Sequence, residues 1–188
     1  KRPRCRAFLA MSAPLGLESD LPLNKPIAIT LGDPAGIGPE IIAKAFRDAP
    51  EALLGCFVAG DVACVRRATA WLQTDGQSRL PVVELESPLQ ALAMPPHCVP
   101  VLQVVPVQAP PAMGQISAQA GRMAGDCVTW AARAALCSEV AAVVTAPLHK
   151  EGLAAAGAPY VDYPGHTELL QAEAAAHLGR SVAELPVR

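Results

Sequence analysis

The sequence predicts an α/β fold built on an open, mostly parallel sheet. Short apolar runs rich in β-branched residues alternate with segments of helical periodicity, and this order is typical of parallel sheets with helices on their faces. A glycine-bearing loop follows the first apolar run, and a polar stretch follows the last one at residues 145–151. Because ligands bind at the carboxyl ends of parallel strands, we expect the functional groups to lie in these loops.

The composition argues against several classes of protein. Of the 188 residues, 52% are hydrophobic and 17% are charged, which is typical of a chain that folds around a sizeable core. The formal net charge of -2 argues against a nucleic-acid partner, because phosphate backbones are bound by clustered Lys and Arg. No apolar run is long enough to span a bilayer, so we expect a cytoplasmic protein without a membrane partner. The spacing of the six cysteines matches no zinc module, and we expect reduced thiols.

The first 25 residues differ from the rest of the chain. Four basic residues lie within the first six positions, and the apolar stretch after them is too short for a signal peptide. We interpret residues 1–25 as a disordered leader or a cloning remnant, and residues 26–188 as the folded part. Residues 186–188 resemble the start of another strand, so we expect the fold to continue beyond them.

Apolar periodicity predicts the position of each element. Strands are predicted at residues 26–31, 53–59, 81–85, 99–107 and 140–144, and helices at residues 41–46, 62–72, 116–136 and 168–178. Residues 73–111 are rich in proline, and we interpret them as a covering region or a strand pair that carries no chemistry. The run at residues 140–144 is apolar throughout, which indicates a strand buried on both faces.

The segment at residues 116–136 is the clearest helix. Ser117 can cap it, and Gly121 and Gly125 leave room for another backbone to approach closely. Its charged residues are expected to form a solvated face, although the first of them could instead bind a phosphate group beside a cleft. These residues are Arg122, Asp126 and Arg133.

The loop at residues 32–40, GDPAGIGPE, joins the first strand to its helix. Such a loop can present backbone N–H groups to an anion. It has neither the full dinucleotide fingerprint nor the Lys-Ser/Thr ending of a P-loop. Ligand binding and a purely structural tight turn are therefore both open for this loop.

A first polar cluster follows the strand predicted at residues 140–144. It contains Thr145, His149 and Lys150, which place a cation and a proton-transfer group at the carboxyl edge of the sheet. Lys150 can equally be a solvated residue paired with Glu151. The cluster is therefore a candidate site whose individual roles stay open.

A second polar cluster, His166-Thr167-Glu168, follows Gly165 and precedes an Ala-rich helical segment. An imidazole at a helix start can donate to an anion, and a Thr hydroxyl there can cap the helix or bind a phosphate oxygen. His166 can also be satisfied by a neighbouring carbonyl group. Because the two clusters are close in sequence and each lies at a helix start, we expect one crevice for an anionic small molecule.

Three motifs in this order resemble a known family. The stretches at residues 32–40 (GDPAGIGPE), 145–151 (TAPLHKE) and 164–168 (PGHTE) resemble the 4-hydroxythreonine-4-phosphate dehydrogenase family of vitamin B6 biosynthesis. Dehydrogenases acting on threonate or erythronate 4-phosphate are similar, so the substrate is less sharply indicated than the family.

The resemblance implies a two-domain fold of the isocitrate and isopropylmalate dehydrogenase type, a homodimer, and a phosphorylated small-molecule substrate. It implies NAD or NADP as the hydride acceptor and a divalent metal (Zn, Mg or Co) that polarises the ketone formed before decarboxylation. On this interpretation residues 26–188 are the N-terminal part of the enzyme, truncated before the remainder.

The resemblance also assigns two residues. In the family the His-Thr pair of the GHTE motif binds the substrate, which corresponds to His166 and Thr167 here. The three metal-binding histidines and most of the nucleotide site of the family lie beyond the position of Arg188, so neither His149 nor His177 is a metal ligand. No catalytic residue is assigned. The alternative to an enzyme is a fragment that binds a ligand or a partner without catalysis.

Overall fold

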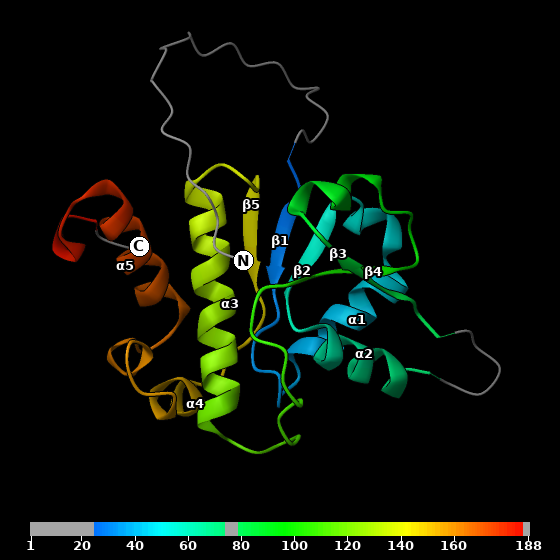
Figure 1. The fold of residues 1–188 in the computed structure, drawn as a ribbon, viewed down its shortest axis with the longest axis horizontal. Coiled ribbons are helices and arrows are strands. Elements are labelled where there is room, and N and C mark those ends of the chain that lie inside the picture. The colour runs from blue at the N-terminus through cyan, green and yellow to red at the C-terminus, as the bar shows by residue number, and fades with distance from the viewer. Residues whose placement is uncertain (1–24, 74–78, 186–188) are drawn as a thin grey trace, which may run out of the picture.

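The computed structural model describes residues 25–73 and 79–185. Its strands form one five-stranded sheet with the order β3-β4-β2-β1-β5, and every neighbouring pair is parallel (Figure 1). The strands are β1 (Ile27–Thr30), β2 (Cys56–Gly60), β3 (Val82–Leu85), β4 (Val99–Gln103) and β5 (Ala142–Thr145). The predicted α/β fold with an open parallel sheet is confirmed, and the proline-rich region supplies the adjacent strands β3 and β4.

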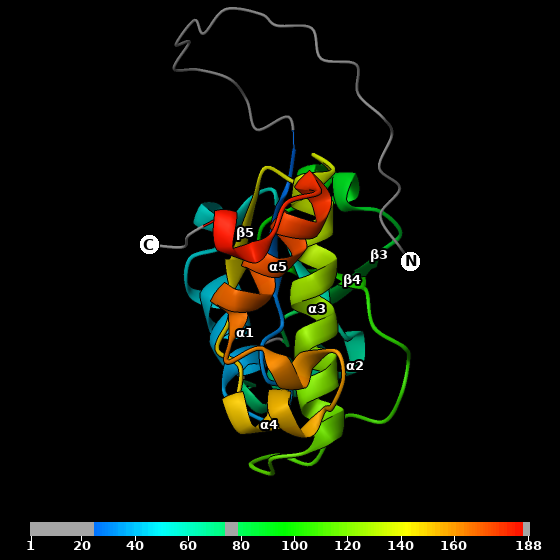
Figure 2. The same ribbon diagram turned by 90° about the vertical axis from the view of Figure 1, so that its left-hand side faces the viewer.

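The helices cover both faces of the sheet. They are α1 (Gly38–Asp48), α2 (Val62–Trp71), α3 (Ala118–Leu136), α4 (Lys150–Ala155) and α5 (His166–Leu178), with short 3-10 helices at Pro50–Leu53, Pro88–Ala93, Tyr160–Asp162 and Val182–Glu184. Figure 2 shows α1 and α3 on opposite sides of the sheet, with α5 outside α3. None of the helices in the described ranges is both long enough and apolar enough to cross a membrane.

Alternation along the strands builds a core on each face. Ile29 and Val58 pack with residues of α1 and α2, such as Ile42. Their neighbours in sequence point to the other face, where the Phe57 and Trp130 rings meet edge to face with centroids 6.1 Å apart. This period of two is what a parallel strand covered on both sides requires.

Strand β5 does not match its predicted burial. The apolar run at residues 140–144 led us to expect coverage on both faces, but β5 is an edge strand that pairs only with β1. Its residues alternate between exposed and half-buried, and Val144 is 52% exposed. The expectation was wrong because an apolar sequence does not reveal how many neighbours a strand has.

Four of the cysteines are buried free thiols: Cys56, Cys64, Cys98 and Cys127. Burial raises the pKa of the Cys64 thiol to about 12 and raises the pKa of Cys127 as well. Residues 1–24 of the predicted leader and the strand expected at residues 186–188 lie outside the described residues.

Candidate functional site at the carboxyl edge of the sheet

The chain leaves the neighbouring strands β1 and β5 toward opposite faces of the sheet. From β1 it continues into α1, and from β5 it continues into α4, which packs against α3 on the other face (Figure 2). Such a switch point opens a crevice between two diverging loops, and ligands of open α/β sheets bind there. Both polar clusters of the sequence follow β5 at this edge.

The loop after β1 is fixed by contacts with the loop after β5. Gly32 has a φ of +70°, and a Cβ at this position would lie 2.4 Å from the carbonyl oxygen of Pro147. The next residue, Asp33, donates its backbone N–H to the same oxygen at 2.8 Å, and its side chain accepts the N–H of Ala35 at 2.9 Å. Gly32 is therefore explained by backbone packing, which supports the structural interpretation of the 32–40 loop.

The loop after β5 carries a capping histidine and an unpaired lysine. His149 is the N-cap of α4, and its Nδ1 accepts the backbone N–H of Gly152 at 3.4 Å. Lys150 begins α4 and is exposed. The expected pairing with Glu151 is absent, since no ion pair among the residues the structure describes includes Lys150.

His166 joins the second cluster to the first. Its Nε2 lies 3.1 Å from the carbonyl oxygen of Ala146, twenty residues earlier in the chain. Because a carbonyl oxygen only accepts, Nε2 must carry the hydrogen of this bond. The other ring nitrogen, Nδ1, makes no hydrogen bond with any residue in the described part of the chain and is available to a ligand.

Thr167 is not the cap of its helix. The N-cap of α5 is Gly165, and no side chain caps the helix at that end. Thr167 lies in the first turn and is exposed, so its hydroxyl is free to bind a ligand at the helix start. Capping therefore does not explain this threonine.

The sequence did not reveal how Gly165 lies between the two clusters. A Cβ on Gly165 would lie 3.9 Å from Lys150 Cε and 3.6 Å from Glu168 Oε2. Lys150 and the start of α5 are thus neighbours in space. The only signal in the sequence was the glycine itself, which does not specify its neighbours.

The charged side chains of α3 also bond to the segments that pack against this helix. Arg122 and Arg133 are exposed, as expected, and Asp126 is half-buried. Arg122 donates to the carbonyl oxygens of Ala156 and, at 3.0 Å, of Ala158, so it holds the segment after α4 and is not directed to a phosphate. Asp126 accepts the hydroxyl of Tyr160 at 2.5 Å, and burial raises the pKa of that tyrosine. These bonds fix the segment after α4 against α3.

The expected room beside the α3 glycines is confirmed. A Cβ on Gly121 would lie 1.7 Å from the carbonyl oxygen of Gly152, and one on Gly125 would lie 2.7 Å from the Tyr160 ring. The third charged residue, Arg133, forms an ion pair with Glu173 of α5 at 2.7 Å. The carboxylate raises the pKa of Arg133 through this hydrogen bond. Together these contacts set the position of the two clusters against the sheet.

The described ranges contain no metal centre. No three His, Cys, Asp or Glu side chains within residues 25–73 and 79–185 are grouped so that they could hold a metal ion. These side chains therefore do not form a binding site for a divalent metal.

The sequence model of one protein family, described as "Pyridoxal phosphate biosynthetic protein PdxA", matches residues 53–185. The D-threonate 4-phosphate dehydrogenase of Salmonella typhimurium is 42% identical over an alignment of 156 residues, and the match covers 78% of this chain and 43% of that protein. The 4-hydroxythreonine-4-phosphate dehydrogenase of Beijerinckia indica is 36% identical over 167 residues, which are 88% of this chain and 47% of that protein.

Solved structures give the same result. The crystal structure of 4-hydroxythreonine-4-phosphate dehydrogenase from Klebsiella pneumoniae matches with a TM-score of 0.66 and 37% identity, covering 79% of this chain and 44% of that one. The chain thus spans less than half the length of these curated relatives. Since the family match covers most of the folded part, the chain belongs to the PdxA family of pyridoxal phosphate biosynthetic proteins.

Proposed function

We propose that this chain supplies the substrate-binding part of an NAD- or NADP-dependent dehydrogenase that oxidises 4-hydroxythreonine 4-phosphate. The observation that carries the proposal is the bond between His166 Nε2 and the carbonyl oxygen of Ala146, which brings two motifs of the family to one edge of the sheet. In this proposal residues 26–188 belong to a two-domain enzyme that acts as a cytoplasmic homodimer. Family membership and the length of the relatives support it.

The reaction requires removal of a hydride and a proton from a secondary alcohol. A bound nicotinamide would supply the acceptor for the C3 hydride. The substrate would also lose its hydroxyl proton, and the resulting β-keto acid, 2-amino-3-oxo-4-phosphooxybutanoate, would lose carbon dioxide. A divalent metal in the whole enzyme would polarise the C3 oxygen. The residues in the described ranges do not hold that metal, so their task is to bind and orient the substrate.

His166 and Thr167 suit this task. The hydrogen bond to Ala146 fixes the imidazole and leaves Nδ1 available to the substrate. Nδ1 can accept a hydrogen bond from a hydroxyl or, in the protonated ring, donate one to an anion. The uncapped start of α5 adds backbone N–H groups and the Thr167 hydroxyl. Substrate binding is therefore assigned to this pair, and no catalytic residue is assigned.

D-threonate 4-phosphate is the second candidate substrate. The Salmonella typhimurium relative that is 42% identical is named for it. Threonate carries a hydroxyl at C2 where hydroxythreonine carries an amino group, and the carboxylate and phosphate are common to both. Both candidates present the same carboxylate and phosphate to the two clusters, so we expect turnover to separate the two substrates.

The direct test is an assay of the protein expressed from its complete coding sequence. Formation of reduced nicotinamide is measured with NAD⁺ and NADP⁺ for 4-hydroxythreonine 4-phosphate and for D-threonate and erythronate 4-phosphates. A higher kcat/KM for the amino substrate supports the first candidate. A higher value for a sugar-acid phosphate supports the second, and no oxidation of any of them contradicts the proposal.

His166→Ala should weaken substrate binding. Loss of a hydrogen bond to an ionised group costs about 1.5–3 kcal/mol, so we expect the substrate KM to rise roughly tenfold or more while the KM for the nicotinamide changes little. His177→Ala is the matched control, because His177 lies exposed in the last turn of the same helix. An unchanged substrate KM and kcat in His166→Ala would exclude the assigned role.

A further inference from the structure

We infer that Lys150 is a further substrate-contacting residue, whose ammonium group binds an anionic group of the ligand held by His166 and Thr167. The inference rests on the proposed function, because it adds a cation to the same site. Nothing in the motif requires it: at the start of a short helix, a lysine is ordinarily a solvated residue.

The first argument is position. Lys150 is separated from the second cluster by a helix and a turn, yet its Cε lies 3.9 Å from the point where a Cβ of Gly165 would be. The bond from His166 to Ala146 holds the two backbones together at this place. An ammonium group one bond beyond Cε is therefore close to the start of α5, the helix whose first turn contains Thr167.

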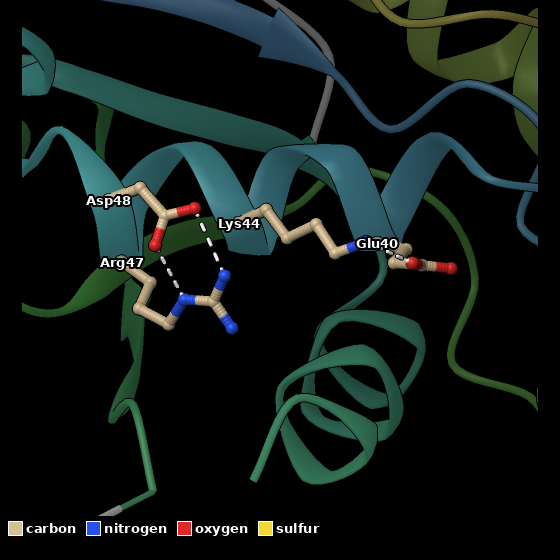
Figure 3. A network of polar contacts seen from close by, with 4 residues as sticks. All are labelled: Glu40, Lys44, Arg47 and Asp48. Atoms are coloured by element: carbon tan, nitrogen blue, oxygen red, sulfur yellow. Dashed lines mark hydrogen bonds and ion pairs between the residues drawn. The ribbon is translucent and has the colours of Figure 1, made fainter. Parts of the chain in front are cut away.

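The second argument is the missing partner. Lys44 is a lysine with an ion-pair partner in this protein. Its Nζ lies 2.5 Å from Glu40 Oε1 on the same helix (Figure 3). Lys150 makes no hydrogen bond or ion pair with any residue of the two described ranges, 25–73 and 79–185. A cation without a carboxylate partner is available to an anion from solution.

The neighbouring carboxylates do not neutralise Lys150. Asp33, on the loop after β1, uses its Oδ1 to accept the N–H of Ala35. Glu151 follows Lys150 in the chain without pairing with it. Glu168 Oε2 and Lys150 Cε both approach the Gly165 position, at 3.6 and 3.9 Å, without forming an ion pair.

The third argument is Gly165 itself. It is buried, but its φ of -178° is extended backbone that any residue adopts, and an added Cβ would meet only ordinary contacts at 3.6 and 3.9 Å. Neither strain nor a clash therefore explains a glycine here. The absent side chain leaves Lys150 free to lie close to the start of α5, where we place the ligand.

The chemistry that Lys150 would recognise is a carboxylate or a phosphate. A primary ammonium is a strongly hydrated point charge that binds either group without the bidentate geometry of arginine. Both candidate substrates carry both groups on one molecule. The shared chemistry is therefore an oxyanion of the substrate, and inhibition by molecules that carry only one of the two groups distinguishes its sources.

The test compares Lys150→Met with Lys150→Arg in the protein expressed from its complete coding sequence, with Lys44→Met as the matched lysine control. Losing one charge-assisted hydrogen bond should raise the substrate KM about tenfold in Lys150→Met and leave kcat closer to the wild-type value. Lys150→Arg keeps the charge and should recover most of the loss. Lys44→Met should match the wild type.

Inhibition constants then identify the anion. If the phosphate is bound, Lys150→Met loses competitive inhibition by inorganic phosphate but keeps inhibition by threonate, which has no phosphate. If the carboxylate is bound, the pattern is reversed. An active wild type whose Lys150→Met variant keeps its KM and both inhibition constants overturns the inference alone. A wild type that oxidises none of the candidate substrates contradicts the proposed function, and the inference falls with it.

Discussion

Strands β2 and β5 have similar apolar sequences and very different surroundings. All five residues of β2 are buried between β1 and β4, whereas the four residues of β5 alternate between exposed and half-buried. The central strand is covered by helices on both faces and by strands on both edges. Strand β5 pairs only with β1, so its packing against the core depends on the helices that follow it in the chain.

The position of β5 and its site loops is set by helix packing more than by strand burial. Helix α4, which begins directly after the loop of β5, packs against α3 at Gly121 and Gly152. The comparison therefore predicts that the β5 side of the molecule is most sensitive to changes in this backbone contact, and the β2 side to changes in side-chain volume.

The largest effect is expected for Gly121→Ala. Its Cβ would lie 1.7 Å from the carbonyl oxygen of Gly152, and a backbone atom cannot move aside as a flexible side chain can. We expect a loss of about 3 kcal/mol in the free energy of unfolding, at the upper end for overpacking, measured by urea denaturation.

Gly152→Ala is the control from the other side of the same contact. A Cβ there meets only ordinary contacts, the nearest at 3.6 Å, so the variant should be neutral or slightly more stable because alanine favours the helix. A Gly121→Ala variant as stable as Gly152→Ala would mean that α3 and α4 do not approach as closely as the structure shows.

The next effect tests the strands directly. Val58 in β2 is fully buried, and Val58→Ala should cost about 2 kcal/mol. Val144 in β5 is 52% exposed, and Val144→Ala should change the stability by less than about 0.5 kcal/mol. The same denaturation experiment measures both. If Val144→Ala costs as much as Val58→Ala, the edge of β5 is covered in solution and the contrast between the strands is lost.

The sequence was sufficient where a local pattern decides the structure. Ser117 caps α3 by accepting the N–H of Ala120, and Gly179 ends α5 with a φ of +63°, both at positions that short-range signals predict. Strand order is not local, so the exposure of Val144 could not be predicted. The bonds of Arg122 and Asp126 were missed for the same reason, because their partners lie more than thirty residues later.

In the candidate site, too, local sequence predicts some features and long-range packing decides the others. The motifs place His166 and Thr167 at a helix start, and the structure puts them there. The bond that joins His166 to Ala146, and the proximity of Lys150 to Gly165, depend on how α4 and α5 return to the sheet edge. Neither motif contains a sequence pattern that predicts how α4 and α5 pack at the sheet edge.

The smallest effect concerns the attachment of α5, which buries only Leu169 and Ala175 of its thirteen residues. Arg133 and Glu173 join α5 to α3, but their side chains are 50% and 17% exposed, so Glu173→Gln should cost less than about 1 kcal/mol. Hydrogen exchange should accelerate within α5 and not in α1. The control, Glu40→Gln, breaks the Lys44 pair within α1 and should leave α5 unchanged (Figure 3). A loss above about 2 kcal/mol for Glu173→Gln would instead place α5 within the cooperative core, because exposed ion pairs do not contribute that much.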